Sequence, residues 1–547
     1  MSPPPAVRLH DPARWPQQRS ALEEVRDCCS NDVLVDILTR TSWHKRDGYS
    51  PSSYGAFEGV AALAEVFDEE DEWWSLVAYI ARLALRSESL FDAPRVPLTF
   101  LPPGVAGYVS LTRIEVASLL ALAFFDALPE QPNHGWHMPD RLTVRSWLHA
   151  EAVDEADGHK AHCLLQYFLR IRHLEELNGG EAAESAEAGA PPSTSDAAQC
   201  AAQCVAQTDA SEPIEIRRLV LQPERAAALT AAGWMACEHP LLPMEVVATG
   251  GLEEARGALQ ADFANEYIGG GVLCGGNVQE EIRFSICPEA LVSLLLCPRM
   301  GDHEAILLSG IRQYASYEGY GSRFECTGAY ADPAASSATV LAIDARPYLG
   351  EDRRAQYTPK EMLRELTKLW AGLSTDGWPA AAPPPATGTH SPTATNATVV
   401  AALTEAPTVA ATAPEATAPE TTGAARKRIR TTTSRSAAAP SVRSAPSAGA
   451  AGSARQPFAT GNWGCGVFGG DLRLKALLQW IAASRAGRTM LYFPYGDPRV
   501  TGLGAAAARL LAAKITVGQL ARALLKADST SLQGGRALDA VLEALGA

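Results

Sequence analysis

The feature that most constrains the fold is a change of hydrophobic pattern part-way along the chain. Up to about residue 177, apolar residues recur at the i, i+3, i+4 and i+7 spacing of amphipathic helices, as in "DEWWSLVAYIARLAL". From residue 214 onward, short β-like runs such as "EIRRLVL", "AILLSG" and "TVLAIDA" alternate with helical stretches such as "TPKEMLRELTKLWAGL". Strands that alternate with helices predict an α/β sheet with helices on both faces. We therefore expect a helical region followed by an α/β domain.

Two segments of biased composition divide the 547-residue chain. Residues 178–213 are rich in Gly, Ala, Glu, Ser and Thr, and residues 374–456 are rich in Ala, Thr, Pro and Ser. Such segments cannot bury enough apolar surface to offset the entropy of ordering. The predicted organisation is an N-terminal extension (1–55), a helical domain (56–177), a low-complexity insert (178–213) and an α/β domain (214–547) interrupted by a disordered insert (374–456).

Two details of the helical region can be predicted. The stretch "SLTRIEVASLLALAFFDAL" indicates one long helix with Ser110 as its N-cap. The cluster of His159, His162 and Cys163 on a later helix is the nearest approach to a metal-ligand set. No paired C-x-x-C motif accompanies this cluster, so an ordinary helix face is the favoured interpretation.

The charge and the ends of the chain exclude some classes of protein. The net charge is −15 and the sequence pI is near 5.3, so we expect no direct DNA binding of the general, basic-faced kind. The N-terminal stretch has no apolar core of a signal peptide, and no apolar run reaches the roughly 18 residues of a membrane span. We expect a soluble protein of the nucleus and/or cytoplasm, without a membrane partner. The basic cluster Arg426–Arg430 fits either a nuclear-import signal or a solvated run of charge.

A first glycine cluster, Gly269–Gly271, follows a β-like run that ends near Asp262. Glycine permits positive φ and a close approach of the backbone to a ligand. Successive amide groups in such a turn can form an anion-binding nest. The same residues also fit a tight bend without any ligand, so the pattern alone leaves both interpretations open.

Two adjacent carboxylates, Glu280 and Glu281, follow Gln279 at the start of the next predicted helix. Glutamates in a first turn complement the helix dipole, which is a purely structural interpretation. Adjacent helical residues point about 100° apart, so two such carboxylates seldom serve one purpose. The functional alternative is that burial and anionic neighbours raise the pKa of one carboxyl until it can act as a general acid.

A second glycine-rich loop, "TGNWGCGVFGGD", precedes a helix that Asp471 is expected to cap. A loop of this kind at a helix N-terminus suits a pyrophosphate, because free amides and the helix dipole both favour anions. Trp463 and Phe468 are predicted to be exposed, where they would stack on a ribose or base or else pack the loop down. Two such loops indicate a diphosphate ligand, and the carboxylates then suggest cleavage of a glycosidic bond beside it.

The triple glycine, the spacer "VLCGGNV" and Gln279–Glu281 together resemble the signature of the poly(ADP-ribose) glycohydrolase family. "QYASYEGY", "TGNWGCGVFGGD" and "SLTRIEVASLLALAFF" resemble further blocks of that family. The resemblance implies a macrodomain-like mixed α/β sheet flanked by helices and preceded by an all-helical accessory domain. It implies hydrolysis of the ribose–ribose O-glycosidic bond of poly(ADP-ribose), mainly from the chain end, without a metal or other cofactor. The implied partners are poly(ADP-ribose) and poly-ADP-ribosylated proteins.

The resemblance also implies roles for individual residues. Glu281 matches the catalytic general acid, Glu280 its ribose-binding neighbour, and Asp262 the third acidic residue of the site. Tyr495 stands where many relatives have a phenylalanine that stacks on adenine, and the spacer departs from the usual pattern by carrying Cys274 and added glycines. The residues that match substrate contacts are Leu252, Glu253, Asn265, Gly269, Gly270, Gly271, Gln279, Tyr317, Tyr320, Asn462, Gly466, Phe468 and Tyr495.

Two other functions remain as alternatives. A macrodomain can bind ADP-ribose without cleaving it, or it can remove mono-ADP-ribose from a protein side chain. The intact pair Glu280 and Glu281 favours an enzyme, because a binding module needs no general acid. The helical region and the tyrosine-rich block argue against the mono-ADP-ribosyl hydrolase.

Overall fold

The computed structural model describes the chain in ten stretches, and all of them belong to one compact unit made of Met1–Pro379 and Ile429–Ala547. The basic cluster at 426–430 and most of the two biased segments lie outside the described residues. The described stretches are residues 4–28, 30–42, 58–67, 69–91, 97–132, 134–139, 141–148, 155–179, 212–374 and 455–547.

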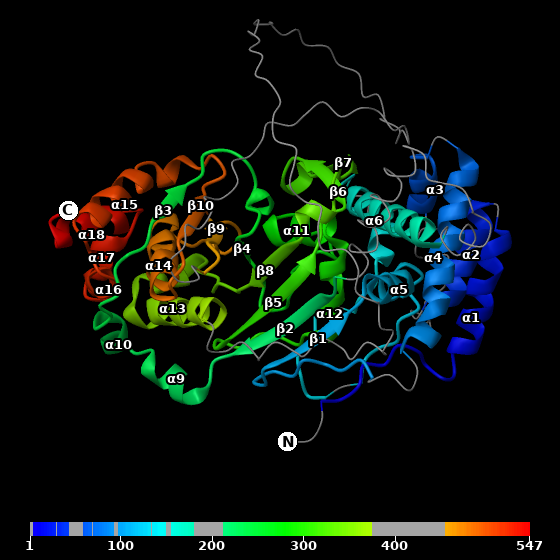
Figure 1. The fold of residues 1–547 in the computed structure, drawn as a ribbon, viewed down its shortest axis with the longest axis horizontal. Coiled ribbons are helices and arrows are strands. Elements are labelled where there is room, and N and C mark those ends of the chain that lie inside the picture. Colours follow the sequence, from blue (N-terminus) through cyan, green and yellow to red (C-terminus); the bar gives the residue numbers. More distant parts are fainter. Residues whose placement is uncertain are drawn as a thin grey trace, which may run out of the picture. The chain divides into compact units, whose positions relative to one another are not determined.

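An eight-stranded mixed sheet forms the centre of this unit, in the order β1-β2-β5-β8-β4-β9-β10-β3 (Figure 1). Neighbours from β1 to β8 run antiparallel, and neighbours from β8 to β3 run parallel. The carboxyl ends of parallel strands meet at one edge, where α/β proteins bind their ligands. The strands are β1 (Gly107–Leu111), β2 (Ile214–Val220), β3 (Met244–Val246), β4 (Leu259–Asp262), β5 (Glu304–Ile311), β8 (Ala338–Ala342), β9 (Phe458–Gly461) and β10 (Met490–Phe493), with a separate hairpin of β6 (Ala315–Glu318) and β7 (Glu325–Ala329).

Helices lie on both sides of this sheet, and Figure 1 shows those of the first third of the chain on one side and those of the C-terminal part on the other. The described part of the segment expected as an N-terminal extension contains helices α1 and α2, and α1 packs on α4. The helices are α1 (Trp15–Glu24), α2 (Asn31–Thr41), α3 (Glu58–Ala64), α4 (Glu70–Phe91), α5 (Arg113–Phe124), α6 (Glu155–Gly179), α9 (Pro223–Ala228), α10 (Ala231–Met235), α11 (Gln279–Ile286), α12 (Val292–Leu296), α13 (Pro359–Leu373), α14 (Leu472–Arg485), α15 (Leu503–Ala512), α16 (Val517–Leu525), α17 (Ser529–Leu532) and α18 (Ala537–Leu545).

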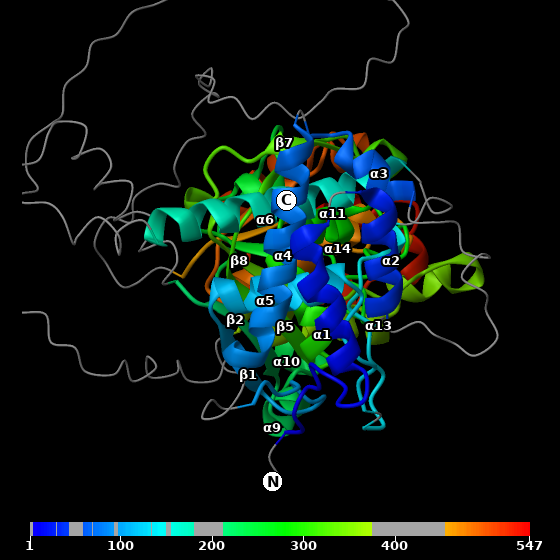
Figure 2. The ribbon, with the colours of Figure 1, turned by 90° about the vertical axis from the view of Figure 1, so that its right-hand side faces the viewer.

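The two faces of the sheet belong to two hydrophobic cores. In β5, Ile306 and Leu308 join the core that contains the N-terminal helices, while Ala305 and Leu307 join the core that contains α13 and α14. This alternation follows from the two-residue period of a strand, and burial on both faces explains the continuous apolar run of β5. The helical region therefore shares one core with the sheet, and Figure 2 shows its helices α1 and α4 in front of the strands. The predicted α/β architecture with a preceding helical region is confirmed.

The predicted N-cap of one helix is wrong. Ser110 is not an N-cap, because Gly107–Leu111 is the edge strand β1, paired antiparallel with β2. Helix α5 begins at Arg113 instead, and Thr112 caps it in a capping box with Glu115, whose carboxylate accepts the Thr112 N–H at 2.8 Å. The sequence carries a signal for each feature: the alternation of apolar Val109 and Leu111 indicates strand β1, and the T-x-x-E pattern indicates the capping box of α5.

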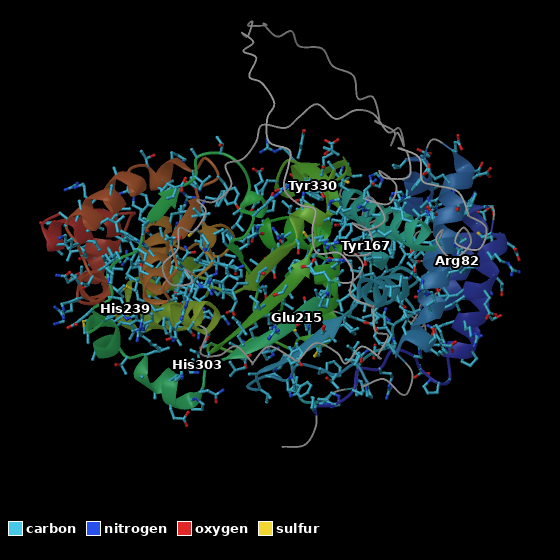
Figure 3. The ribbon with its side chains drawn as sticks, viewed as in Figure 1. Arg82, Tyr167, Glu215, His239, His303 and Tyr330 are labelled. Carbon is cyan, nitrogen blue, oxygen red and sulfur yellow. The ribbon has the colours of Figure 1, made fainter. Side chains whose placement is uncertain are left out.

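A buried charge pair joins the helical region to the sheet domain just after this cap. The guanidinium of Arg113 bonds the carboxylate of Glu289, and it also donates to the carbonyl oxygen of Gly310 at 2.8 Å. Tyr314 donates its hydroxyl to the same carboxylate at 2.6 Å, and Tyr167 of α6 (Figure 3) packs edge-on against Tyr314 with ring centroids 4.7 Å apart. The contact between the two regions is therefore polar and specific as well as apolar.

Among the helices of the described stretches, none combines the length and the apolar composition that a bilayer crossing requires.

The two ends of the 374–456 segment lie together. The guanidinium of Arg488 donates to the carbonyl oxygen of Leu373 at 3.2 Å and to that of Gln456 at 2.9 Å. Ser374 is buried, and its N–H donates to Trp370 at 3.0 Å in the last turn of α13. A short connection can therefore replace the segment without moving either end.

We predict that replacing residues 376–454 by a short Gly-Ser linker preserves cooperative unfolding. Tm should stay equal or rise, because the shorter loop costs less closure entropy, a gain of up to about 2 kcal/mol. Differential scanning calorimetry of the two proteins measures this. A fall in Tm of more than about 4 °C would instead mean that the segment packs on the domain.

Candidate active site

The site lies at the carboxyl edge of the sheet, where β4 ends between its parallel neighbours β8 and β9. The chain leaves β4 at Asp262, passes through the glycine cluster and enters α11 at Gln279. The side chain of Gln279 joins the two elements, because its amide oxygen accepts the N–H of Phe263 at 2.8 Å and its amide nitrogen donates to Ala261 at 3.3 Å. Gln279 therefore fixes the start of α11 against the end of β4.

Glu280 and Glu281 both turn toward the glycine loop, although they are neighbours on one helix. The carboxylate of Glu280 accepts the N–H groups of Gly269 at 2.7 Å and Asn265 at 2.8 Å. The carboxylate of Glu281 accepts those of Gly271 and Val278, each at 2.9 Å. The loop wraps around the first turn of α11, so carboxylates that point about 100° apart both meet backbone amides. Glycines and acids occur together in this segment because they bond each other.

Two glycines are required by the close approach of these carboxylates. Gly270 has φ +53°, and a Cβ atom there would collide with Glu281 Oε1 and would lie 2.5 Å from Glu280 Oε2. A Cβ atom at Gly276 would lie 2.9 Å from the carbonyl group of Gly271 and 3.0 Å from Glu281 Cδ. Only glycine leaves room for both carboxylates against the backbone, so the first glycine cluster is more than a flexible bend.

Asp262 adds a third carboxyl group to this pair. It is fully buried, and neither of its oxygens has a hydrogen-bond partner among the described residues. Burial, with Glu281 nearby, raises the pKa of Asp262 to about 8, and the charge of Arg283 opposes this rise. Burial also raises the pKa of Glu280 well above its ordinary value, with Asp262 and Glu281 adding to the effect. Asp262 therefore keeps its proton at neutral pH.

Arg283 is a further site residue that the motifs did not indicate; it is 5% exposed and lies one turn after Gln279 on α11. Its charge acts on Asp262, Tyr317 and Tyr495, so it lies between the acidic residues and the aromatic side of the site. An arginine inside the apolar stretch "IRFSI" was the available signal, because charged side chains are seldom buried without a partner.

Residues expected on the adenine side come together from three elements. The hydroxyl of Tyr317 on β6 donates to Glu253 Oε1 at 2.5 Å, and Leu252, beside Glu253, is buried. Tyr495 follows β10 with φ +51°, a conformation that non-glycine residues seldom adopt, and it is 49% exposed. The charge of Glu253 and the hydroxyl of Tyr320 both act on the hydroxyl of Tyr495, so these groups lie near one another. These side chains form one aromatic group with an exposed face.

The second glycine loop leads from the end of β9 to α14 and contacts the end of β10. Asn462 donates its side-chain amide to Pro494 at 3.1 Å and accepts the hydroxyl of Tyr492 at 2.9 Å. Gly466 is exposed and Phe468 is half-buried. Asp471 caps α14 by accepting the N–H of Leu474 at 3.0 Å, which confirms the predicted cap.

The predicted exposure of Trp463 is wrong. Its ring is fully buried, its indole N–H donates to Ile343 at 2.8 Å, and the Lys475 ammonium lies 4.3 Å from the ring centroid. Trp463 follows β9 directly and fills the core beneath the loop. Of the two roles left open for this side chain, the structure supports packing.

The described residues contain no group of three or more His, Cys, Asp and Glu side chains arranged to hold a metal ion. The pair His159 and His162 forms an edge-on ring contact, 5.8 Å between centroids, and burial lowers the pKa of His162 to about 4. Cys163 is buried beside them in α6. These residues lie on an ordinary helix face.

Comparison with known families decides the relationship. A model of the catalytic, macro-domain-fold part of poly(ADP-ribose) glycohydrolase matches residues 231–502, and the model of its helical domain matches residues 67–183. The chain belongs to the poly(ADP-ribose) glycohydrolase family. The resemblance read from the triple glycine and Gln279–Glu281 is thereby confirmed, while the roles of individual site residues stay predictions.

Relatives in two organisms show the same relationship. In Arabidopsis thaliana, "Poly(ADP-ribose) glycohydrolase 1" is 28% identical over 533 residues, covering 91% of this chain and 86% of the relative. "Probable poly(ADP-ribose) glycohydrolase 2" of the same plant is 27% identical over 463 residues, covering 82% and 74%. "Poly(ADP-ribose) glycohydrolase 2" of Caenorhabditis elegans is 48% identical over 88 residues, covering 16% and 18%.

The raised pKa of Asp262 predicts how stability depends on pH. A carboxyl with a folded pKa of about 8 binds its proton more tightly in the folded protein than in the unfolded chain. Its contribution to the free energy of unfolding is therefore complete below about pH 4 and is lost as pH rises through 8. We expect the free energy of unfolding to fall more over this range in the parent protein than in Asp262→Asn, by at least about 1 kcal/mol.

Denaturant titrations at a series of pH values measure this difference. Asp352→Asn, at an exposed position, is the matched control and should keep the pH dependence of the parent. Equal pH dependence in the parent and in Asp262→Asn would show that Asp262 is ionised in the folded protein.

Proposed function

We propose that this chain hydrolyses the ribose–ribose O-glycosidic bond of poly(ADP-ribose), mainly at the chain end, and releases ADP-ribose. The family to which it belongs is a glycohydrolase acting on this polymer. The observation that carries the proposal is the bonding of Glu280 and Glu281 to the glycine loop beside buried Asp262. This arrangement places a fixed carboxyl group at the sheet edge where a ribose would lie.

Glu281 acts as the general acid in this proposal. It gives a proton to the bridging glycosidic oxygen while the bond from that oxygen to the anomeric carbon breaks, with an oxocarbenium-like transition state. It then takes a proton from the water that attacks the anomeric carbon, which leaves a hydroxyl on each product. The N–H groups of Gly271 and Val278 fix the carboxyl, and fixed geometry is a large part of catalytic power.

Glu280 and Asp262 support this acid. Glu280 binds ribose hydroxyls and also fixes the loop through Gly269 and Asn265. Asp262 makes no hydrogen bond and acts through its proximity to Glu281. Carboxyls held this close cannot all ionise, and Asp262 is the one that keeps its proton at neutral pH.

The remaining contacts divide between the diphosphate and the adenosine. Asn462, Gly466 and Phe468 would lie against the diphosphate and its ribose, with the N-terminus of α14 favouring the negative charge. On the adenine side, the proposed contacts are Leu252, Glu253, Tyr317, Tyr320 and Tyr495. The exposed ring of Tyr495 offers the same flat face for stacking as a phenylalanine.

Other parts of the proposal concern the whole chain. We propose poly-ADP-ribosylated proteins as the partners that carry the polymer, and the nucleus and/or cytoplasm as its location. The division into an extension (1–55), a helical domain (56–177), an insert (178–213) and a catalytic domain (214–547, with an insert at 374–456) stays a proposal. An ADP-ribose reader and a mono-ADP-ribosyl hydrolase are the alternatives that the experiment must separate.

We predict that Glu281→Gln lowers the release of ADP-ribose from purified poly(ADP-ribose) by at least about 10²-fold. The amide keeps the shape of the side chain and one accepting oxygen but has no proton to transfer. Affinity for ADP-ribose should stay within a few-fold. Chromatographic product analysis and isothermal titration calorimetry measure the two quantities.

Glu224→Gln, an exposed position on α9, is the control and should keep full turnover. Full turnover by Glu281→Gln would assign the acid to another residue. Polymer that binds the parent protein and stays intact would identify a reader, and release of mono-ADP-ribose from protein alone would identify the other hydrolase.

A further inference from the structure

The glycine loop is held from outside as well as from inside. On its outer side, the carbonyl oxygen of Val272 accepts the indole N–H of Trp147 at 3.1 Å and the ammonium of Lys160 at 3.2 Å. The next carbonyl oxygen, of Leu273, accepts the hydroxyl of Ser146 at 2.6 Å. All three donors belong to the helical region, since Ser146 and Trp147 lie on the 3₁₀ helix η3 (Arg145–Leu148) and Lys160 lies on α6.

These donors are placed deep in the protein. Trp147 is 2% exposed and Lys160 is 1% exposed, and Val272 between them is fully buried. Lys160 also bonds the carboxylate of Asp157 at 2.7 Å, one turn earlier on α6. Burying an ammonium is unfavourable unless it is paired and hydrogen-bonded, and Lys160 is held by both the carboxylate of Asp157 and a carbonyl of the loop.

The inner and outer bonds together define the position of the loop. Its amide groups at Gly269 and Gly271 point inward to Glu280 and Glu281, while its carbonyl groups at Val272 and Leu273 point outward to the helical region. A segment with five glycines between residues 269 and 276 has an unusually large choice of backbone conformations. The outer donors restrict the loop to one backbone conformation, and they do so from the side opposite Glu280 and Glu281.

We propose that Ser146, Trp147 and Lys160 of the helical region are positioning residues for catalysis. They hold the loop from residue 269 to 278 in the one conformation that aligns the carboxyl of Glu281 with the bond to be cleaved. The inference rests on the proposed function of Glu281. The helical region would thus take part in the reaction through the backbone of the loop, which its three donors bond.

The proposal predicts a loss of turnover without a loss of binding. A displacement of about 1 Å can lower a rate by about 10²-fold, whereas the diphosphate and adenine contacts lie on other loops. Trp147→Phe removes the indole N–H and retains an aromatic ring in the core. We expect kcat on poly(ADP-ribose) to fall by about 10-fold or more, with KM and ADP-ribose affinity within about 2-fold.

Trp73→Phe is the matched control. Trp73 is also fully buried in the helical region, and its indole nitrogen finds no acceptor among the described residues. Both substitutions trim one buried indole of the same core, but only Trp147→Phe releases the loop. The double variant Asp157→Asn with Lys160→Met, which removes the ammonium without stranding a buried carboxylate, should lower kcat in the same way.

Hydrogen–deuterium exchange of the peptide covering residues 269–278 gives a readout independent of turnover. We expect faster exchange of this peptide in Trp147→Phe than in the parent or in Trp73→Phe, at equal Tm. Parental kcat and parental exchange in Trp147→Phe would overturn the proposal, and so would equal losses in Trp147→Phe and Trp73→Phe. A parent protein without any turnover would defeat the proposed function, while the exchange experiment would still test the hold on the loop.

Discussion

The structure of the site depends on four hydrogen bonds between two adjacent carboxylates and the backbone of one glycine loop. Glu280 and Glu281 take the amide groups that a ligand-free loop would otherwise leave unsatisfied at the edge of the sheet. Those bonds explain why Gly270 carries no side chain and why two adjacent acids can both face the same loop. Buried carboxyls are unfavourable, and the amides repay part of that cost.

The helical region is part of the same folded unit as the sheet and the site. It contributes strand β1 to the sheet, shares the core that covers one face, and supplies Arg113 to the buried carboxylate of Glu289. Removing one member of such a pair typically costs about 3–5 kcal/mol, because the other charge is left buried alone. The helical domain and the macro-domain-fold part therefore form one folded unit, and the helical domain is not a separate accessory domain.

The sequence predicted those features that a local pattern encodes. The buried strands β5 and β8, the helices α13 and α14, and the cap at Asp471 all carry their own periodicity or capping signal. Ser110 was misassigned because a five-residue strand runs directly into a capped helix. Trp463 was misassigned because a glycine-rich setting gives no sign of which core lies beneath it.

Long-range contacts were beyond any local pattern. The bond from Trp147 to Val272 spans 125 positions of the sequence, so no window of the chain contains both partners. The roles of Glu281 and Asp262 came from a motif, whereas the burial that raises the pKa of Asp262 comes from the assembled sheet. In this protein the residue types were readable from the sequence, and their environments were supplied by tertiary packing.

One consequence follows from Arg488, whose single guanidinium binds both ends of the 374–456 segment. Because the exit and the return of the chain are fixed at one point, anything inserted there leaves the register of β9 and the approach of α13 unchanged. We therefore expect changes in the length of this segment to leave the catalytic loops in place. Arg488 thus makes this position of the chain tolerant of insertions.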